Sequence, residues 1–245
     1  MEQFASALDR FSGCDGGNLD KGKIWLCGIE YAGGDSCESI AQELSRDVSN
    51  PPPPREKPES FLSYRYNQGA LNILCALSGK YGDKYEDFFR SESCFAPDSD
   101  YFKLNLYPLG FRTVDPLLWQ ECHSRLTGFD SKEEYTCWCR THRFPQLRAW
   151  ATQQQHPPKL ILCTGKSYRD DFFSTFGNRE SQTQDERAGK PIWYLVTNNG
   201  QTLVAVTYFP GGRHGLNSNE KLSATGQRLA QILRDHGLGE YSARA

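Results

Sequence analysis

Four short apolar runs along the chain predict buried β-strands. They cover residues 23–29, 101–107, 159–163 and 203–209. Short runs of this kind, ending in Gly, Pro or polar residues, are typical of parallel strands that helices cover on both faces. The pair Asn199-Gly200 lies between two apolar segments and is a strong hairpin signal. We therefore expect the last strand to pair with a neighbour at 192–196.

Between these strands the apolar residues recur at helical spacing. Residues 68–77 and 219–234 are the clearest cases, and Asn217, with Glu220 three residues later, is expected to cap the second helix. Strands that alternate with helices predict an α/β fold. We expect a three-layer α/β/α domain around a central, mainly parallel four-stranded sheet, spanning residues 1–245.

Two segments interrupt this pattern. Asn50 and the four prolines that follow predict a stiff, Pro-rich loop at 50–58 rather than a domain boundary. Residues 177–190 are almost entirely polar, and we expect a mobile surface excursion there.

Composition narrows the class of protein. The chain has 245 residues and 27.8 kDa, with 38% hydrophobic residues, 24% charged residues and a mean hydropathy of -0.66, which is typical of one large soluble domain. No apolar run approaches a membrane span, and the first residues do not resemble a secretory signal. A net charge of -2 disfavours polyanion binding through bulk charge but allows a local basic groove.

Cysteine usage predicts the compartment. The chain has 9 cysteines, an odd number, and Cys27 and Cys163 lie inside strand-like runs where buried thiols are common. We expect a cytoplasmic protein in a reducing environment, without a disulfide framework.

Cysteines and histidines also gather in one region, which raises two further hypotheses. Cys122, His123, Cys137, Cys139 and His142 offer ligands for zinc, although the gap between Cys137 and Cys139 is tighter than the usual zinc-binding spacing. Reduced cysteines in a helical segment are the simpler interpretation. Papain-like catalysis needs a Cys opposite a His, and no local signature singles out such a pair.

In parallel sheets, ligands bind at the carboxyl ends of the strands, so the residues that follow each strand matter most. Glu30 follows the first strand, and Asn105 lies at the end of the second. The third strand leads into residues 164–167 and the fourth into residues 209–214. Because these ends are rich in Gly and Pro and carry an acid, an amide and basic residues, we expect them to form one cleft.

Residues 164–167 (Thr-Gly-Lys-Ser) resemble the last residues of a phosphate-binding P-loop motif. That motif needs a Gly five residues before the Gly-Lys pair, and the position holds Leu160. An ordinary strand-to-helix turn is therefore favoured over nucleotide-triphosphate hydrolysis.

Glu30 and Asn105 are the residues with the strongest chemical signal. An acid directly after an apolar strand is costly to bury, so it caps a helix, forms an ion pair or does chemistry at the strand end. A lone Asn in an apolar strand needs hydrogen-bond partners, which is a structural role by default. An acid and an amide at neighbouring strand ends can together orient a water molecule and bind a polar ring edge.

The order of these motifs resembles the uracil-DNA glycosylase superfamily over residues 23–236. The matching segments are 28–30 (Gly-Ile-Glu), 105–109 (Asn-Leu-Tyr-Pro-Leu) and 209–213 (Phe-Pro-Gly-Gly-Arg). In that family the corresponding motifs are Gly-x-Asp/Asn-Pro, a strand-borne Asn and His-Pro-Ser-Pro. The second segment is similar to the single-strand-selective monofunctional branch.

The resemblance implies roles for individual residues. Glu30 would orient the attacking water, and Asn105 would recognise the base. Phe209 stands where the family has a His that stabilises the leaving base, so His214 or Arg213 is the expected substitute. Ala32 stands where uracil-specific members have a Tyr that excludes 5-substituents. We therefore expect a 5-substituted pyrimidine rather than plain uracil.

The remaining expected contacts fall into two sets. The base would be enclosed or stacked by residues drawn from Tyr31, Ala32, Gly33, Tyr64, Tyr66, Tyr107 and Phe209. The DNA would be held by Gly211, Gly212 and Arg213, with Arg213 as the wedge in the duplex, and by Lys166 and Arg112 on phosphates.

The resulting prediction is a monofunctional DNA glycosylase that flips out a modified pyrimidine and leaves an abasic site. The resemblance implies no metal or organic cofactor, DNA as the partner, and no membrane or obligate protein partner. The superfamily includes an anti-phage glycosylase that removes glucosylated hydroxymethylcytosine, and a role in such defence competes with repair of damaged pyrimidines. A non-catalytic nucleic-acid or nucleotide-binding module and a hydrolase of small nucleosides are the alternative functions.

Overall fold

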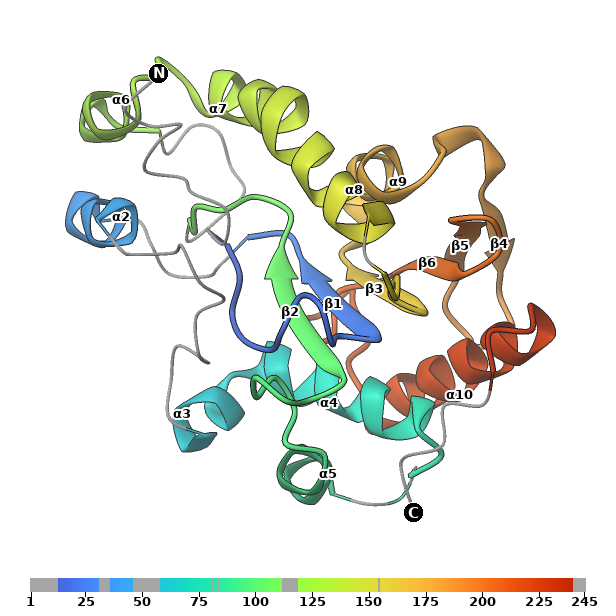
Figure 1. Cartoon of the computed structure of the whole chain (residues 1–245). Helices are drawn as coiled ribbons and strands as arrows, with labels where there is room; N and C mark the ends of the chain where they lie inside the picture. Colours follow the sequence, from blue (N-terminus) through green and yellow to red (C-terminus); the bar gives the residue numbers. More distant parts are fainter. Residues whose placement is uncertain are drawn as a thin grey trace.

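The computed structural model is built around a six-stranded sheet (Figure 1). It describes residues 13–30, 36–45, 58–80, 82, 84–111, 119–153 and 155–239. The strands are β1 (Ile24–Gly28), β2 (Tyr101–Asn105), β3 (Leu160–Thr164), β4 (Thr183–Asp185), β5 (Ile192–Thr197) and β6 (Thr202–Thr207). Their order in the sheet is β2-β1-β3-β6-β5-β4.

The four strands predicted from the apolar runs form the parallel half of the sheet, β2-β1-β3-β6. The predicted α/β class is confirmed, but the sheet is larger than the four strands expected. The additional strands β5 and β4 join the β6 edge in antiparallel order. The expected hairpin joins β5 to β6, with Asn198, Asn199 and Gly200 at φ values of 52°, 53° and 85°. Asn and Gly are the residues that adopt this left-handed conformation most readily.

Helices cover both faces of the sheet (Figure 1). They are α2 (Cys37–Leu44), α3 (Pro58–Ser63), α4 (Arg65–Leu77), α5 (Tyr85–Ser91), α6 (Glu121–Thr127), α7 (Lys132–Trp138), α8 (Phe144–Gln153), α9 (Arg169–Phe176) and α10 (Asn219–Asp235). One turn of π-helix (Cys139–Arg143) joins α7 to α8, and 3-10 turns precede α9 (Lys166–Tyr168) and β4 (Arg179–Ser181).

Helices α4 and α10 pack against each other beneath one face of the sheet. They meet at Gly226, where a Cβ atom would lie 2.3 Å from the carbonyl oxygen of Ile73, so only glycine allows this approach. Leu26, Leu162 and Ala205 point from the strands into this layer. The predicted helix at 219–234 is confirmed, but its N-cap is Ser218, whose hydroxyl accepts from the Lys221 N–H, and not Asn217.

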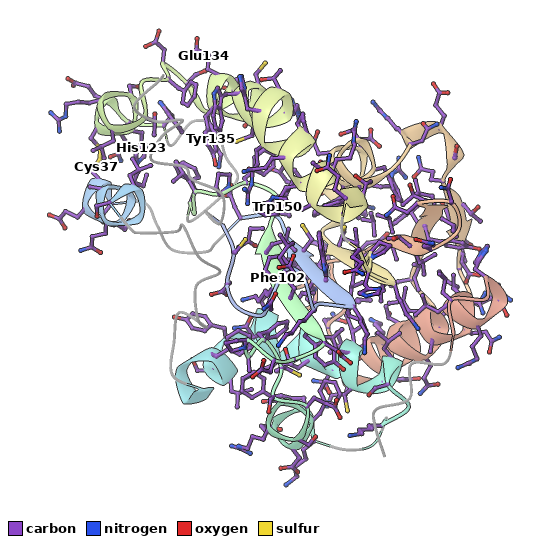
Figure 2. All side chains as sticks on the ribbon, in the orientation of Figure 1. Cys37, Phe102, His123, Glu134, Tyr135 and Trp150 are labelled. Carbon is purple, nitrogen blue, oxygen red and sulfur yellow. A yellow bond between two sulfur atoms is a disulfide. The ribbon has the colours of Figure 1, made fainter. Side chains whose placement is uncertain are left out.

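Helices α8 and α9 cover the opposite face (Figure 1). Trp25 and Phe102 lie in this layer with their ring centroids 5.4 Å apart, and Trp150 of α8 belongs to the same cluster (Figure 2). Every residue of β1, β2 and β3 is buried, because both faces are covered. That double cover explains why these strands are unbroken apolar runs rather than alternating patterns.

The outer edge of β2 is protected by the segment 13–17. Asp15 and Asn105 donate their backbone N–H groups to Lys103 and Gly13 at 2.9 and 2.8 Å. The Lys103 side chain, buried with that of Asp15, forms an ion pair with it. This pairing covers a strand edge that would otherwise expose its hydrogen-bonding groups.

The polar segment 177–190, predicted as a mobile excursion, is partly ordered into the sheet. It contributes β4, which pairs with β5. Asp185 at the end of β4 is buried and forms ion pairs with Arg187 and with Arg228 of α10, at 2.6 and 2.8 Å. Backbone pairing with β5 and these ion pairs explain why β4 joins the edge of the sheet although its sequence has no apolar pattern. The predicted Pro-rich loop lies outside the described residues up to residue 57, and Pro58 begins α3.

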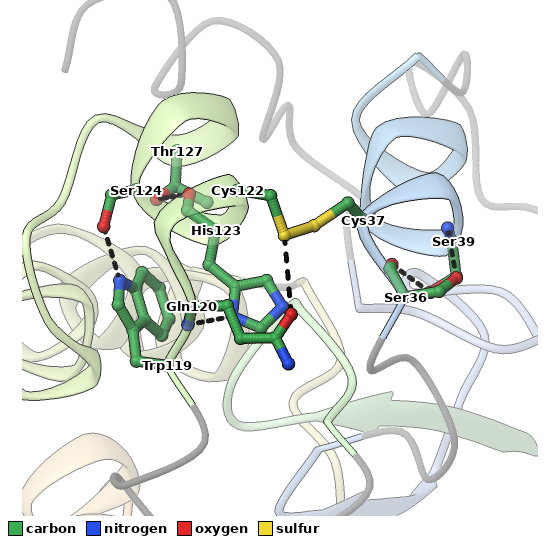
Figure 3. Close-up of a disulfide and its surroundings, with 9 residues drawn as sticks. All are labelled: Ser36, Cys37, Ser39, Trp119, Gln120, Cys122, His123, Ser124 and Thr127. Atoms are coloured by element: carbon green, nitrogen blue, oxygen red, sulfur yellow. Dashed lines mark hydrogen bonds between the residues drawn. A yellow bond between two sulfur atoms is a disulfide. The ribbon is translucent and has the colours of Figure 1, made fainter.

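A disulfide joins Cys37 of α2 to Cys122 of α6, 85 residues apart in sequence (Figure 3). The expectation of reduced cysteines without a disulfide framework is therefore wrong for this pair, while the other 7 cysteines are free. Neither cysteine lies in a pattern that marks it for pairing. The two helices that carry them come together only in the folded chain.

Within the described ranges, no helix combines the length and the apolar character that crossing a membrane requires.

The disulfide makes a testable contribution to stability. We expect Cys37→Ser to lower the free energy of unfolding by about 2–5 kcal/mol, because the crosslink restricts the unfolded chain. Denaturant unfolding without reductant measures this, with Cys137→Ser at an exposed free cysteine as the control. Equal stability of the two variants would contradict the crosslink.

Candidate functional site

Strands β1 and β2 stay paired beyond their last residues. Leu106 donates its backbone N–H to Gly28, at 2.9 Å, and Tyr107 donates to Ile29, at 2.8 Å. These bonds hold the two strand ends together as they leave the sheet. As a result, Glu30 and Tyr107 line the same cavity.

This cavity has a volume of about 240 Å³. Besides Glu30 and Tyr107, it is lined by Lys132, Tyr135 and Arg140, which come from α7 and the π-helical turn, and by Tyr168, which precedes α9. Glu133 and Thr136 complete its wall. Two acids, two cations and three phenols thus surround a space of small-molecule size at the carboxyl edge of the sheet.

The charge of Glu30 is balanced inside the cavity. Its Oε1 lies 3.4 Å from the Nζ of Lys132, and the two side chains are only 7% and 8% exposed. The Lys132 ammonium also lies 4.2 Å from the centroid of the Phe111 ring. Removing one member of such a pair leaves a buried charge, which is costly, so the pair fixes the carboxylate in position.

A second charged network supports Tyr107. Its hydroxyl donates to Asp171 at 2.7 Å, and Arg140 donates two hydrogen bonds of 2.9 Å to the same carboxylate. Burial, followed by the bond to Asp171, raises the pKa of Tyr107. Burial, followed by the charge of Glu30, raises the pKa of Tyr168 to about 12. Both phenols therefore keep their protons at neutral pH and act as hydrogen-bond donors.

Asn105, the predicted base-recognition residue, lies on the opposite side of the sheet from this cavity. It pairs with Gly28, and its Oδ1 is 2.4 Å from where a Cβ of Gly28 would lie. Its Nδ2 donates to Gly13 at 3.4 Å, and the residue is 4% exposed. The Asn105 side chain therefore packs directly against the backbone of β1 at Gly28, which has no side chain.

Tyr66 of α4 lies beside this pair. Its hydroxyl lies 2.9 Å from Thr164 Oγ1 and 3.2 Å from the Cβ position of Gly28. Its ring also contacts Phe209, with the centroids 5.2 Å apart. Phe209 is 44% exposed, unusual for so large an apolar side chain. Asn105 and Phe209 thus gather around Tyr66, separately from Glu30 and Tyr107.

The segment that follows β6 forms a closed loop. Leu216 donates to Phe209 and Gly211 donates to Leu216, each at 3.0 Å. Gly211 and Gly212 have φ values of 124° and 70°, which favour glycine. Arg213 and His214 are exposed on this loop and do not line the cavity of Glu30. The structure therefore does not bring the expected substitute, His214, to the carboxylate.

Of the other predicted site residues, Lys166 lies in the described part of the chain and four lie outside it. Lys166 is exposed just after β3, where Gly165 has a φ of 132° and the chain turns into α9, as expected for an ordinary strand-to-helix connection. Tyr31, Ala32, Gly33 and Arg112 lie outside the described residues, so their predicted contacts stay predictions.

The residues that complete the cavity, and Asp171 that supports two of them, were not found from the sequence. Lys132 is 102 residues from Glu30, and Asp171 is 31 residues from Arg140. Tyr168 also comes from a distant segment. None of them lies in a motif, so only the packing of α7 and α9 over the strand ends identifies them.

The proposed zinc ligands do not assemble as a set. Cys122 is bonded to Cys37, Cys137 is exposed and Cys139 is buried. His142 stacks on Trp138, with centroids 5.0 Å apart. A different trio does come together in the described chain, Cys37, Cys122 and His123 (Figure 3). Its sulfurs are joined as a disulfide, and His123 Nδ1 accepts the Gln120 N–H at 2.9 Å, so this state offers no thiolate to a metal.

No protein-family model matches the sequence, and a search of curated proteins finds no significant match.

The contact between Gly28 and Asn105 gives a specific prediction. Gly28→Ala is expected to lower the free energy of unfolding by about 1–3 kcal/mol, because the added methyl group collides with the Asn105 amide. The same substitution in an Asn105→Ala background should cost less, since the colliding group is gone. Denaturant unfolding of the four proteins measures this coupling, and an equal cost in both backgrounds would contradict it.

Proposed function

We propose that this protein is a monofunctional DNA glycosylase of the uracil-DNA glycosylase type, acting on a modified, 5-substituted pyrimidine. The observation that carries the proposal is the Glu30 carboxylate, buried at the end of the first parallel strand inside a cavity of about 240 Å³. Strand-end acids in such cavities are typical of sites where charge is used in chemistry.

The proposed reaction is hydrolysis of the N-glycosidic bond. As the bond between C1′ and the base breaks, positive charge develops on the sugar, and Glu30 stabilises it. Glu30 also orients the water whose oxygen bonds to C1′, while the base leaves with the electron pair of the broken bond and takes up a proton. The products are the free base and an abasic site. The ion pair with Lys132 supports this role because it fixes the carboxylate in the cavity.

The leaving base needs a hydrogen-bond donor, and Phe209 cannot supply one. Tyr168 lines the cavity of Glu30, and its pKa of about 12 keeps its hydroxyl protonated. We propose that this hydroxyl takes the part expected of the missing His. Arg213 and His214, exposed on the loop after β6, are then left to contact DNA.

Base recognition is proposed for the group around Tyr66. Asn105 would bind the polar edge of the flipped base, and Phe209 would stack on it. Gly28 supports this arrangement because it places no side chain between Asn105 and the segment that leads to Glu30. One nucleotide would then lie across the end of β1, with one edge of its base at Asn105 and its glycosidic bond beside Glu30 and Tyr168.

The biological role proposed is excision of modified pyrimidines in the cytoplasm, either in defence against phages with glucosylated hydroxymethylcytosine or in repair. The 7 free cysteines support a reducing compartment, although the disulfide does not. DNA is the proposed partner. The expectation of a roomy pocket depends on Ala32 and Gly33, as the resemblance to the glycosylase motifs implies.

A non-catalytic nucleic-acid-binding module is the second candidate. The observation in its favour is that Phe209 replaces the family's His and that His214 does not reach Glu30. Such a module would bind DNA without breaking a bond. The buried Glu30–Lys132 pair then has only a structural role.

The test compares the wild type with Glu30→Gln on DNAs that contain uracil, 5-hydroxymethyluracil, 5-hydroxymethylcytosine or glucosylated hydroxymethylcytosine. We expect alkali-labile abasic sites on one of these substrates and a loss of at least about 100-fold in rate for Glu30→Gln. Glu133→Gln is the matched control, because Glu133 lines the same cavity but is exposed to solvent.

Glu30→Gln leaves Lys132 buried without its carboxylate, so thermal unfolding is measured alongside. The double variant Glu30→Gln/Lys132→Met removes both charges and should recover stability but not activity. Free nucleosides are included to detect a small-nucleoside hydrolase. DNA that is bound but never loses a base would reject the enzyme in favour of the binding module.

A further inference from the structure

Two lysines share one aromatic ring at the carboxyl edge of the sheet. The Nζ of Lys166 lies 4.9 Å from the centroid of Tyr208, and the Nζ of Lys190 lies 4.6 Å from it. Lys166 also donates a hydrogen bond of 3.3 Å to the Tyr208 hydroxyl. Two like charges therefore flank one ring, and an anion bound beside it would interact favourably with both.

These ammonium groups differ from those lysines of the protein that are neutralised by a carboxylate. Lys21, Lys23, Lys80, Lys103 and Lys132 each form an ion pair with a carboxylate. In the part of the chain that the structure describes, neither Lys166 nor Lys190 has such a partner. Lys166 begins the 3-10 turn before α9, and Lys190 lies in a bend two residues before β5, so the ends of β3 and β5 set their positions.

The topology explains why they meet. Lys166 follows β3, Tyr208 follows β6, and Lys190 precedes β5, which runs antiparallel to β6. All three positions therefore lie at the carboxyl edge of the parallel strands. This is the same edge from which Glu30 and Phe209 emerge, so the lysines extend the candidate site along the sheet toward β5.

A third cation, Arg169, lies over an aromatic ring next to Tyr208. Arg169 lies over Trp193, 5.3 Å from its ring, and the centroid of Trp193 is 5.8 Å from that of Tyr208. The Nε of Arg169 forms an ion pair of 3.5 Å with Asp170, a carboxylate that it shares with Arg179. We name these five residues, Lys166, Arg169, Lys190, Trp193 and Tyr208, the cation–aromatic patch.

We propose that the cation–aromatic patch binds the phosphodiester backbone of the DNA strand that carries the target base. The proposal rests on the proposed function and extends it, since it assigns a backbone-binding role to Lys190 and Tyr208. Backbone phosphates are regularly spaced anions, and a row of separated cations fits them better than one small ion does. It also explains how a protein with a net charge of -2 can hold DNA: the positive charge is local.

The test measures binding of a short fluorescein-labelled duplex and of its single strand, both with unmodified bases, by fluorescence anisotropy over a series of salt concentrations. We expect Lys166→Ala and Lys190→Ala each to weaken binding about three- to tenfold. Each should also reduce the slope of log affinity against log salt by about 0.7–0.9, the value for one phosphate contact. Lys166→Arg and Lys190→Arg should retain most of the affinity because they keep the charge.

Lys159→Ala is the matched control. Lys159 is exposed and precedes β3, so it lies at the opposite end of the strand that leads to Lys166. Its removal changes the net charge equally but should leave affinity and salt slope close to those of the wild type. Thermal unfolding of each variant confirms that the fold is intact.

Three results would overturn the proposal: equal weakening by Lys159→Ala, unchanged binding by the Lys166→Ala/Lys190→Ala double variant, or no DNA binding by the wild type. A fourth would be that inorganic phosphate binding falls in the variants while DNA binding does not. Base excision is scored separately. A wild type that binds through the patch but excises no base would leave this proposal standing and reject the glycosylase, whereas excision unaffected by the lysine variants would reject the patch alone.

Discussion

The close pairing of Gly28 with Asn105 is the constraint on which the candidate site depends. A side chain at residue 28 would occupy the space of the Asn105 amide, whose Oδ1 lies 2.4 Å from the ideal Cβ position. With no side chain there, β1 and β2 remain in register through their last residues and stay hydrogen-bonded beyond them. That continued pairing delivers Glu30 and Tyr107 to one cavity and leaves Asn105 fixed on the other side of the sheet.

The cavity combines charges that would be costly to bury singly. Glu30 is paired with Lys132, and Asp171 is paired with Arg140 and bonded to Tyr107. Such pairs contribute little net stability, because desolvation offsets the attraction between the charges. Their value lies in position: each carboxylate is held in one geometry, and the phenols of Tyr107 and Tyr168 keep their protons. A preorganised acid beside neutral donors suits a reaction in which charge develops at a bound ligand.

The parallel strands place the side chains of both candidate sites at one edge of the sheet. A disulfide and an ion pair between segments far apart in sequence then fix the surrounding helices and strands. The disulfide between α2 and α6 joins the elements that follow the loops after β1 and β2 (Figure 3). At the other end of the sheet, Asp185 ties β4 to α10 through Arg228. The cation–aromatic patch lies between β3 and β5 at the same carboxyl edge. The candidate cavity and the candidate DNA-contacting surface are thus both built on the ends of rigid strands.

The sequence by itself determined the α/β class, the four parallel strands and the strand ends that carry Glu30 and Asn105, because apolar runs and the residues that end them are local properties. It did not determine how far the sheet extends, since β4 is held by pairing and ion pairs rather than by apolar pattern. It did not reveal Lys132 or the Cys37–Cys122 bond, whose partners lie 102 and 85 residues away. Asn105 and Tyr107 show the limit most clearly. Because they are two residues apart, a continuous strand would place both side chains on the same face of the sheet. However, β2 ends at Asn105, so the alternation of side chains between the two faces does not continue to Tyr107. Only the tertiary structure turns Tyr107 toward the opposite face.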